Sequence, residues 1–231
     1  MKSLAIIPAR GGSKRLPGKN IRNFAGKPML AWSGEAALDS GLFETVMVST
    51  DSEEIAAVAR EAGATVPFLR SAETADDHAV LLDVVAEVFG RYEAEGRRFE
   101  RLCCILPTAP LLRAATLQHA ASLMDKGGFD TVFPVVAFGY PVQRALRRDA
   151  AGLTAMQQPE HYASRSQDLE PVFHDAGQFY WMTRQACLAK QPTFAGRAGR
   201  FVIDEMDAQD IDTLTDWRLA ELKLQLAASA R

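Results

Sequence analysis

A glycine-rich segment at residues 7–20 carries the first side chains whose types and spacing could do chemistry. Three cations stand among its glycines: Arg10, Lys14 and Lys19. Glycines allow backbone N–H groups to approach an anion closely, and cationic side chains neutralise phosphate oxygens. The segment therefore predicts a phosphate-binding loop, with an ordinary basic surface loop as the alternative.

Two common phosphate motifs do not describe this loop. A Walker loop has the pattern G-x-x-x-x-G-K-[ST], whereas five residues separate Gly12 from Gly18 and Asn20 stands where Ser or Thr is required. The G-x-G-x-x-G pattern is also missing. A kinase-type NTPase site and a nicotinamide-binding fingerprint are therefore excluded.

A pair of carboxylates near the other end of the chain, Asp210 and Asp212, forms the second chemical feature. In an extended segment both side chains lie on one face, because side chains alternate along a strand. Their hard oxygens suit Mg²⁺, which keeps several waters and bridges to substrate phosphates. The alternative is a helix cap, in which Asp212 or Thr213 begins the last helix and Asp216 completes the capping pattern. Both roles are compatible if Thr213 caps and Asp212 binds the metal.

The elements that must position these segments alternate along the chain. Short apolar strands are expected at residues 2–8, 45–50, 65–69, 102–106, 131–136, 178–182 and 201–203, and helices at 28–40, 52–61, 80–92, 114–126 and 213–228. This pattern predicts one α/β domain over residues 1–231, with a mainly parallel sheet flanked by helices. The loop then lies at the carboxyl edge of the sheet, where open α/β sheets bind ligands.

One segment, residues 138–178, breaks this rhythm with three prolines and no helical period. It predicts an excursion of short strands and loops that serves as a lid or an oligomer contact.

Composition narrows the class of protein. Hydrophobic residues make up 48% and charged residues 24% of the chain, which is typical of a globular protein. No apolar stretch approaches about 18 residues, so we expect no membrane span, and the first residues do not form a secretion signal. Three cysteines make no disulfide framework, which favours the cytoplasm. The adjacent Cys103 and Cys104 are expected to pack inside a strand.

The small net charge of −3 hides an asymmetry. Residues 1–34 hold seven Lys or Arg and no acid, whereas residues 201–217 hold six acids and no base. An anion site near the start and a cation site near the end is one interpretation, and scattered solvated charge is the other. Neither end is basic enough to indicate nucleic-acid binding.

The loop sequence IPARGGSKRLPGKN resembles the pattern ARxGSKxxPxKN of the CMP-sialic acid synthetase family of nucleotidyltransferases. The resemblance implies a three-layer, Rossmann-like nucleotidyltransferase fold of GT-A type, with the loop wrapped around the triphosphate of CTP. The nucleotide-binding residues that it implies are Arg10, Gly12, Ser13, Lys14, Lys19, Asn20 and Arg70. It gives Arg10, Lys14, Lys19 and Asp212 catalytic roles, and it gives none to Arg15, whose position is often Gly.

The similarity extends along the chain. Residues 48–51 resemble the family's VSTD element, and residues 69–73 resemble LRPAE, although Arg70 could also be a solvent-facing turn residue. Residues 210–213 match a DxDT element, which favours metal binding by both carboxylates. Residues 106–113 resemble QPTSPLR, but Leu106 replaces a Gln that lies near the sugar, and this argues against N-acetylneuraminate.

Three blocks in the middle of the chain resemble the branch of the family that acts on pseudaminic acid: residues 141–146, 165–170 and 174–181. The implied sugar-binding residues are Gln143, Arg144, Arg165, Gln167, His174, Asp175 and Gln178. A guanidinium such as that of Arg165 can bind the sugar carboxylate through two hydrogen bonds. His174 also has a purely structural interpretation.

The resemblance implies a magnesium-dependent enzyme that transfers CMP from CTP to the anomeric hydroxyl of a nonulosonic acid and releases pyrophosphate. Pseudaminic acid is the expected sugar, and N-acetylneuraminate, legionaminate or a 3-deoxy sugar acid is the alternative. A non-catalytic CTP-binding sensor is an alternative of another class. The family commonly forms homodimers through the excursion, so a homodimer is expected. No side chain stands out as the general base.

Overall fold

The computed structural model describes residues 2–12, 15–75 and 80–229. Its centre is a seven-stranded sheet with the order β11-β6-β10-β5-β1-β4, and β9 pairs with β6. The strands are β1 (Ser3–Pro8), β4 (Thr45–Ser49), β5 (Arg101–Ile105), β6 (Thr131–Ala137), β9 (Phe173–Asp175), β10 (Phe179–Thr183) and β11 (Ala198–Val202). Only β9 and β10 oppose the common strand direction, so the expectation of a mainly parallel sheet is confirmed.

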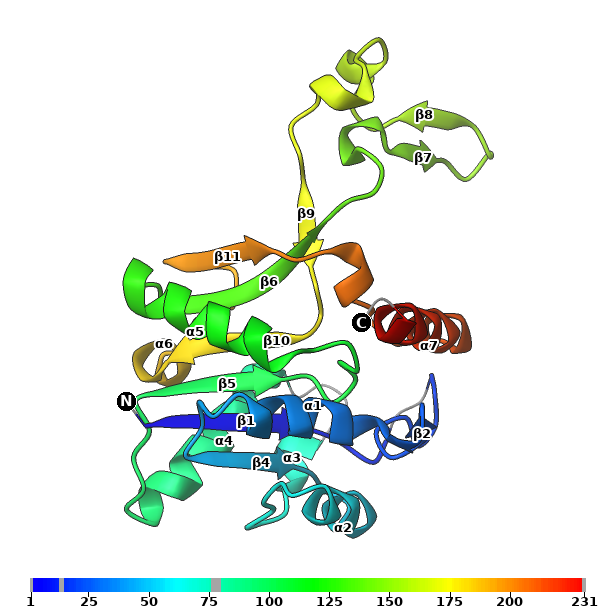
Figure 1. The fold of residues 1–231 in the computed structure, drawn as a ribbon. Helices are drawn as coiled ribbons and strands as arrows, with labels where there is room; N and C mark the ends of the chain where they lie inside the picture. Colours follow the sequence, from blue (N-terminus) through cyan, green and yellow to red (C-terminus); the bar gives the residue numbers. More distant parts are fainter. Residues whose placement is uncertain (1, 13–14, 76–79, 230–231) are drawn as a thin grey trace.

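Helices cover both faces of this sheet, which gives three layers (Figure 1). One face packs against α1 (Met29–Asp39), α2 (Glu53–Glu61) and α5 (Ala114–Gly127), and the other against α4 (Leu81–Ala94) and α6 (Arg184–Leu188). Strand β1 is buried along almost its whole length because its side chains meet a helical layer on each side. The expected α/β architecture is therefore confirmed.

The expectation of a strand at residues 65–69 is wrong. Thr65 forms a single bridge to Met47, and the chain then leaves the sheet. Pro67 explains the difference, because a proline has no N–H to donate to the next rung of the ladder. Two short helices were not expected, α3 (Ala72–Ala75) and α6, and neither was the hairpin β2 (Asn23–Phe24) and β3 (Lys27–Pro28).

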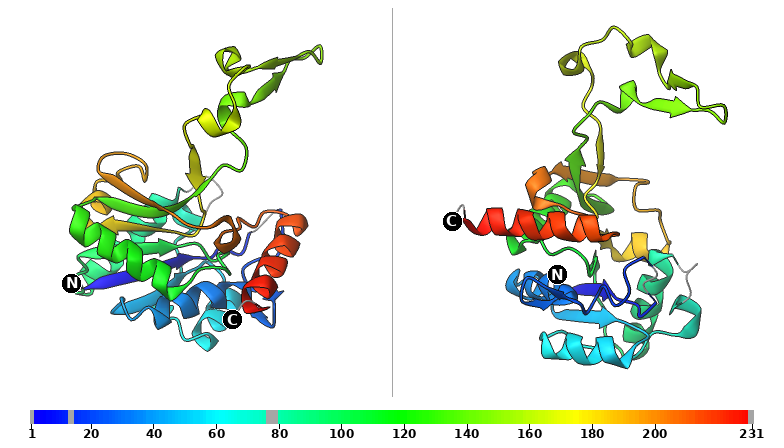
Figure 2. Two further views of the ribbon diagram at one scale, coloured as in Figure 1. Left: turned by 45° about the horizontal axis from the view of Figure 1, so that its top comes forward. Right: turned by 90° about the vertical axis from the view of Figure 1, so that its right-hand side faces the viewer.

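The excursion is shorter than the expected residues 138–178. Strand β9 pairs antiparallel with the end of β6, with Ala137 opposite Phe173, so the chain is back in the sheet at Phe173. We call residues 138–172 the arm. It contains the hairpin β7 (Leu146–Arg148) and β8 (Thr154–Met156) and the 3₁₀ turns η1 (Val142–Arg144), η2 (Pro159–His161) and η3 (Ser166–Asp168). The arm projects from the body in every view (Figures 1 and 2).

The cysteine prediction is confirmed, since Cys103 and Cys104 lie in β5 and are fully buried. Burial raises the pKa of the Cys104 thiol to about 12, so this thiol is unreactive at neutral pH. Among the described residues, no helix is long and apolar enough to cross a membrane.

The C-terminal helix α7 (Leu214–Ser229) returns to the beginning of the chain. Its Trp217 packs edge-on against Phe24, with ring centroids 5.2 Å apart. Together with Leu16 and Ile211 these rings belong to one buried apolar group, which we call the terminal cluster; it also contains Met29 and Ala220. The cluster holds the segment before α7 against the loop after β1, so the two chemical segments of the sequence become neighbours.

Candidate active site

The glycine-rich loop leaves the sheet at the carboxyl end of β1 and is held there by backbone contacts. The N–H of Ala9 donates to the carbonyl of Ser49 at 2.9 Å. The N–H of Gly11 donates to Asp51 Oδ1 at 3.0 Å, which ties the loop to the end of β4. Ser13 and Lys14 lie outside the described residues, so their predicted roles stay predictions.

Asn20 acts within the loop itself. It is only 6% exposed, and its side-chain amide donates to the carbonyl of Arg10 at 3.0 Å. Its own carbonyl accepts from the N–H of Leu30 in α1. In this structure Asn20 therefore braces the two ends of the loop, whereas the family resemblance assigns it to CTP.

Arg70 is not the solvent-facing turn residue of the alternative interpretation, because it is only 9% exposed. Its guanidinium donates to the carbonyl of Ser49 at 2.6 Å and to Ser49 Oγ at 3.1 Å. Burial lowers the pKa of Arg70, although the nearby carboxylates of Asp51 and Glu87 oppose that shift. Arg70 thus places positive charge at the carboxyl end of β4, beside the glycine-rich loop.

Glu87 of α4 organises the turn that follows Arg70. Its carboxylate accepts from the Ser71 N–H at 2.9 Å, and from the hydroxyls of Ser71 and Thr74. Burial raises the pKa of Glu87, but these hydrogen bonds outweigh burial and hold it below its usual value.

The carboxylate pair lies on the short segment between β11 and α7. Ile211 is completely buried in the terminal cluster, and the residues on both sides of it retain access to solvent. This alternation matches the expected extended segment, in which Asp210 and Asp212 share a face. Partial burial of its carboxyl, together with the charge of Asp212, raises the pKa of Asp210.

The helix cap is made by other residues. Thr213 Oγ1 accepts from the N–H of Asp216 at 3.2 Å, and the Asp216 carboxylate accepts from the N–H groups of Thr213 and Asp212 at 2.7 and 3.1 Å. This reciprocal arrangement is a capping box. The Asp212 carboxylate is therefore not used as the cap, which confirms that the two roles considered for this segment are compatible.

The loop and the carboxylate pair meet through ion pairs. Arg15 Nη1 lies 2.6 Å from Asp212 Oδ2, and Lys19 Nζ lies 3.5 Å from Asp212 Oδ1. Lys19 Nζ also donates to the carbonyl of Ile211 at 2.5 Å. The basic start and the acidic end of the chain thus meet in space, while the predicted anion and cation sites stay predictions.

A third segment, residues 175–180, completes the edge of the site. Asp175 accepts hydrogen bonds from the Gly177 N–H at 3.1 Å and from the hydroxyl of Tyr180. Burial and the Asp175 carboxylate raise the pKa of Tyr180, so it stays a neutral hydrogen-bond donor. Gly177 has φ +64°, and a methyl group built on it would lie 3.6 Å from Asp210 Cβ. The turn therefore packs directly against the carboxylate pair.

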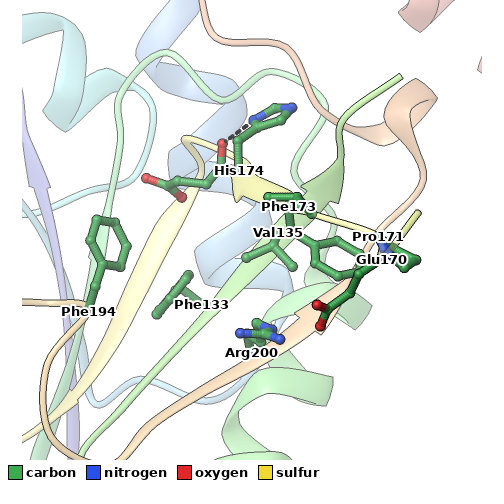
Figure 3. Close-up of a pocket in the computed structure, with 10 residues that line it drawn as sticks. Phe133, Val135, Glu170, Pro171, Phe173, His174, Phe194 and Arg200 are labelled. Atoms are coloured by element: carbon green, nitrogen blue, oxygen red, sulfur yellow. Dashed lines mark hydrogen bonds between the residues drawn. The ribbon is translucent and has the colours of Figure 1, made fainter. Parts of the chain in front are cut away.

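Asp175 also lines a pocket of about 480 Å³ (Figure 3). Aromatic rings form much of its wall: Phe133 lies 5.0 Å from Phe194 between ring centroids, and Phe173 lies under the guanidinium of Arg200. His174 lies at its edge, where its Nδ1–H donates to the carbonyl of Asp175 at 2.8 Å. The pocket thus offers a largely apolar wall with one cation, Arg200, and two carboxylates, Glu170 and Asp175.

The structure divides the predicted sugar-binding residues into two groups. His174 and Asp175 line the pocket, and Gln178 lies nearby, 2% exposed, with its amide nitrogen donating to the carbonyl of Asp207 at 2.6 Å. The others, Gln143, Arg144, Arg165 and Gln167, lie on the arm, which projects away from the carboxylate pair of the same chain (Figure 1). There Arg165 pairs with Asp168 at 2.8 Å, and Gln143 donates to the carbonyl of Glu170.

The pocket residues that the sequence did not predict include Phe133, Phe194 and Arg200. Phe133 lies in an apolar strand, so the sequence predicts only a core residue there. Phe194 lies in a loop that contains no motif. The only signal for Arg200 was a lone cation beside the apolar residues of β11.

The carboxylate pair fits a magnesium ion by its chemistry. Its oxygens are hard, and burial together with the charge of Asp212 raises the pKa of Asp210. In the described part of the chain, no three His, Cys, Asp or Glu residues gather into a metal-binding group. A site with two protein carboxylates suits Mg²⁺, because this ion usually completes its shell with waters and substrate phosphates.

Fold and site together define a nucleotidyltransferase, and the comparison with known families names the group. Residues 4–223 match the cytidylyltransferase family, and the chain belongs to that family. The resemblance seen in the sequence is therefore confirmed.

Individual relatives narrow the comparison. The chain is 40% identical over 222 residues to a pseudaminic acid cytidylyltransferase of Campylobacter jejuni, covering 96% of both proteins. It is 33% identical to a CMP-N,N'-diacetyllegionaminic acid synthase of Legionella pneumophila, covering 100% of this chain and 99% of that protein. The fold is similar to a CMP:2-keto-3-deoxy-manno-octonic acid synthetase solved with CTP, with a TM-score of 0.72 and 19% identity, covering 99% of this chain and 100% of the other.

The first prediction concerns the turn after Arg70. Because the folded-state pKa of Glu87 lies below its usual value, its stabilisation is present above about pH 4.3 and is lost as the pH falls through the lower folded-state value. Glu87→Gln should lower the free energy of unfolding by about 1 kcal/mol at pH 7 and by clearly less at pH 3.5. Urea unfolding at both pH values measures this, with the exposed Glu61→Gln as control. An equal loss at both pH values would contradict the assignment.

Proposed function

We propose that this protein transfers CMP from CTP to the anomeric hydroxyl of a nonulosonic acid, with pseudaminic acid as the sugar, and releases pyrophosphate. The observation that carries the proposal is the contact between the basic loop and the carboxylate pair, made by Arg15 and Lys19 with Asp212, beside the aromatic pocket. The C. jejuni relative, similar over nearly its whole length, is a pseudaminic acid cytidylyltransferase.

The nucleotide side of the site is basic. Arg10, Lys14 and Lys19, together with the N–H groups of the glycine-rich loop, hold the triphosphate in line for attack at the α-phosphorus. Lys19 is already fixed by Ile211 and Asp212, so its charge needs little reorganisation when phosphate binds. Catalysis then consists mainly of positioning and electrostatic stabilisation.

Asp210 and Asp212 are the residues that would hold Mg²⁺. When bound, the ion would neutralise charge that develops at the α-phosphate and on the leaving pyrophosphate. Asp212 is fixed by Lys19, by the buried Ile211 and by the capping box that holds its N–H.

The sugar side of the site is the pocket that Asp175 shares with the aromatic residues. Apolar walls favour a sugar that carries methyl groups on acylamino or deoxy positions, and Arg200 offers a partner for a carboxylate. Leu106 packs with Phe133 and Tyr180 behind this wall, at the position where sialic acid enzymes carry a Gln. An apolar Leu there supports a sugar other than N-acetylneuraminate.

The test of the function is pyrophosphate release. Purified protein with CTP and MgCl₂ should release pyrophosphate with pseudaminic acid, and much more slowly with N-acetylneuraminic or legionaminic acid. Release with another sugar acid would keep the chemistry and overturn the sugar. No release with any sugar, combined with CTP binding by calorimetry, would favour a non-catalytic CTP sensor. Omission of MgCl₂ with added EDTA should abolish release.

A variant of the carboxylate pair tests the metal assignment. Asp212→Ala should lower kcat by about 100- to 1000-fold, the usual effect of removing one electrostatic stabiliser of a transition state. Circular dichroism and the unfolding midpoint should remain close to wild type, because Thr213 and Asp216, and not Asp212, cap α7. Turnover near the wild-type rate would refute the role of Asp212.

We also propose that the protein is a homodimer, formed through the arm, and that it acts in the cytoplasm. The arm exposes Phe138, Tyr140, Leu146, Leu153 and Tyr162, which are large apolar side chains. Its hairpin forms a separate two-stranded sheet, and an isolated hairpin is marginally stable in water. The three buried free thiols suit a reducing compartment. In a dimer, the predicted sugar-binding residues on the arm could serve the site of a second copy.

An arm deletion tests the dimer. Ala137 and Phe173 are paired across β6 and β9, so a short glycine-serine turn can replace residues 140–170 without stretching the sheet. We expect a dimer for the full chain and a folded monomer for the deletion, measured by light scattering after gel filtration. A monomeric full chain, or a dimeric deletion variant, would contradict the proposal.

A further inference from the structure

Arg15 makes an ion pair that the proposed reaction does not use. Its Nη1 lies 2.6 Å from Asp212 Oδ2, and the two residues are 197 positions apart in the sequence. Asp212 is one of the two carboxylates that we assign to the metal ion. The guanidinium charge at Asp212 Oδ2 opposes the approach of a divalent cation to the same carboxylate, because the two positive charges repel each other. The ion pair therefore competes with metal binding.

The two cations on Asp212 are held very differently. The Lys19 side chain is only 18% exposed and is also bonded to the carbonyl of Ile211, so it is fixed to the acidic segment. The Arg15 side chain is 72% exposed and reaches Asp212 only with its tip. Reorientation of Arg15 disturbs no packing, whereas reorientation of Lys19 breaks a second hydrogen bond. Arg15 is the partner that can leave.

The balance of charge around Asp212 determines when Arg15 leaves this carboxylate. Asp210 and Asp212 carry two negative charges, and Arg15 and Lys19 carry two positive charges within the same site. A divalent ion added alone produces an excess of positive charge, and like charges at short range repel. A triphosphate that arrives with the ion removes this excess and offers Arg15 new oxygens, which guanidinium groups bind well.

We infer that Arg15 is an exchangeable counter-ion of Asp212: it holds the carboxylate until CTP arrives, then moves to the triphosphate, so that metal and nucleotide bind together. Arg15 is thus a positioning residue that couples two binding events. The inference rests on the proposed function, because it takes Asp212 as a metal ligand.

The direct test is metal affinity without nucleotide. Free Mn²⁺ is measured by electron paramagnetic resonance during titration of the full chain, and the binding lost in Asp212→Ala defines the site. Arg15→Gln should bind Mn²⁺ about two- to fivefold more tightly than wild type, which is the range expected for release of an exposed ion pair. Arg15→Lys should stay close to wild type because it keeps the charge.

Arg22→Gln is the matched control. It removes the same charge a short distance along the chain, where the Arg22 guanidinium lies over the Trp217 ring at 5.2 Å. Its Mn²⁺ affinity should equal that of wild type. An unchanged affinity in Arg15→Gln, or an equal gain in Arg22→Gln, would overturn the inference.

The reciprocal measurement uses CTP. Calorimetry gives the CTP affinity in EDTA and in MgCl₂, and the ratio of the two values should be smaller in Arg15→Gln than in wild type, since coupling between two ligands is reciprocal. Binding of Mg²⁺ by free CTP cancels when the two proteins are compared. An equal ratio in both proteins would overturn the inference.

Failure of this inference and failure of the proposed function are distinguishable. Wild-type pyrophosphate release together with an unchanged Mn²⁺ affinity in Arg15→Gln would remove only the counter-ion role. A complete lack of Mn²⁺ binding that depends on Asp212, in every variant, would overturn the metal assignment and the inference with it.

Discussion

The terminal cluster is the constraint on which the site depends. Its buried rings and aliphatic side chains come from the loop after β1, from β2 and α1, and from α7 and the segment before it, so it joins the two ends of the chain. Ile211 is the critical member, because it is completely buried and stands between the two carboxylates. Apolar burial of Ile211 therefore helps to set their direction, together with the Lys19 contacts and the capping box. Once Ile211 is docked, Asp212 lies within reach of Lys19 and Arg15.

The polar residues around the terminal cluster fall into two groups: some stabilise the local structure, and others face the site. Asp51 and Asn20 hold the loop through its backbone, Glu87 orders the turn after Arg70, and Thr213 with Asp216 caps α7. Because these residues make the hydrogen bonds that hold the loop, the turn and the start of α7, the charges of Lys19 and Asp212 can face the site. Similarly, Tyr180 and the Gly177 N–H fix the carboxylate of Asp175 at the border between the carboxylate pair and the pocket. Preorganised dipoles and charges of this kind are what phosphate transfer requires.

Much of this arrangement could be predicted from the sequence. Apolar runs located six of the seven sheet strands, and turn residues located the loop and the cap, because these features depend on local periodicity and backbone chemistry. The strand expected at 65–69 failed at Pro67, where hydrogen-bond capacity overrides an apolar pattern. Strand β9 was hidden inside the excursion, because three residues are too few to show a period. The contact of Arg15 with Asp212, and the meeting of Phe133 with Phe194, depend on strand order and helix packing, which no local pattern encodes. The proposed role of the arm residues requires a second copy of the chain, which no pattern within one chain can indicate.

The arm enters and leaves the body at two residues that already face each other, Ala137 and Phe173. Insertions at such a point leave strand order, core volume and the terminal cluster untouched, since the two ends meet whether the inserted segment is long or short. Selection can therefore alter the length and sequence of the arm without refolding the catalytic body. In evolutionary terms the arm is a module: if it carries the proposed oligomer contacts and sugar contacts, these can change while the catalytic body is inherited unchanged. Chimeras that exchange arms at this junction are accordingly a direct way to recombine the two properties.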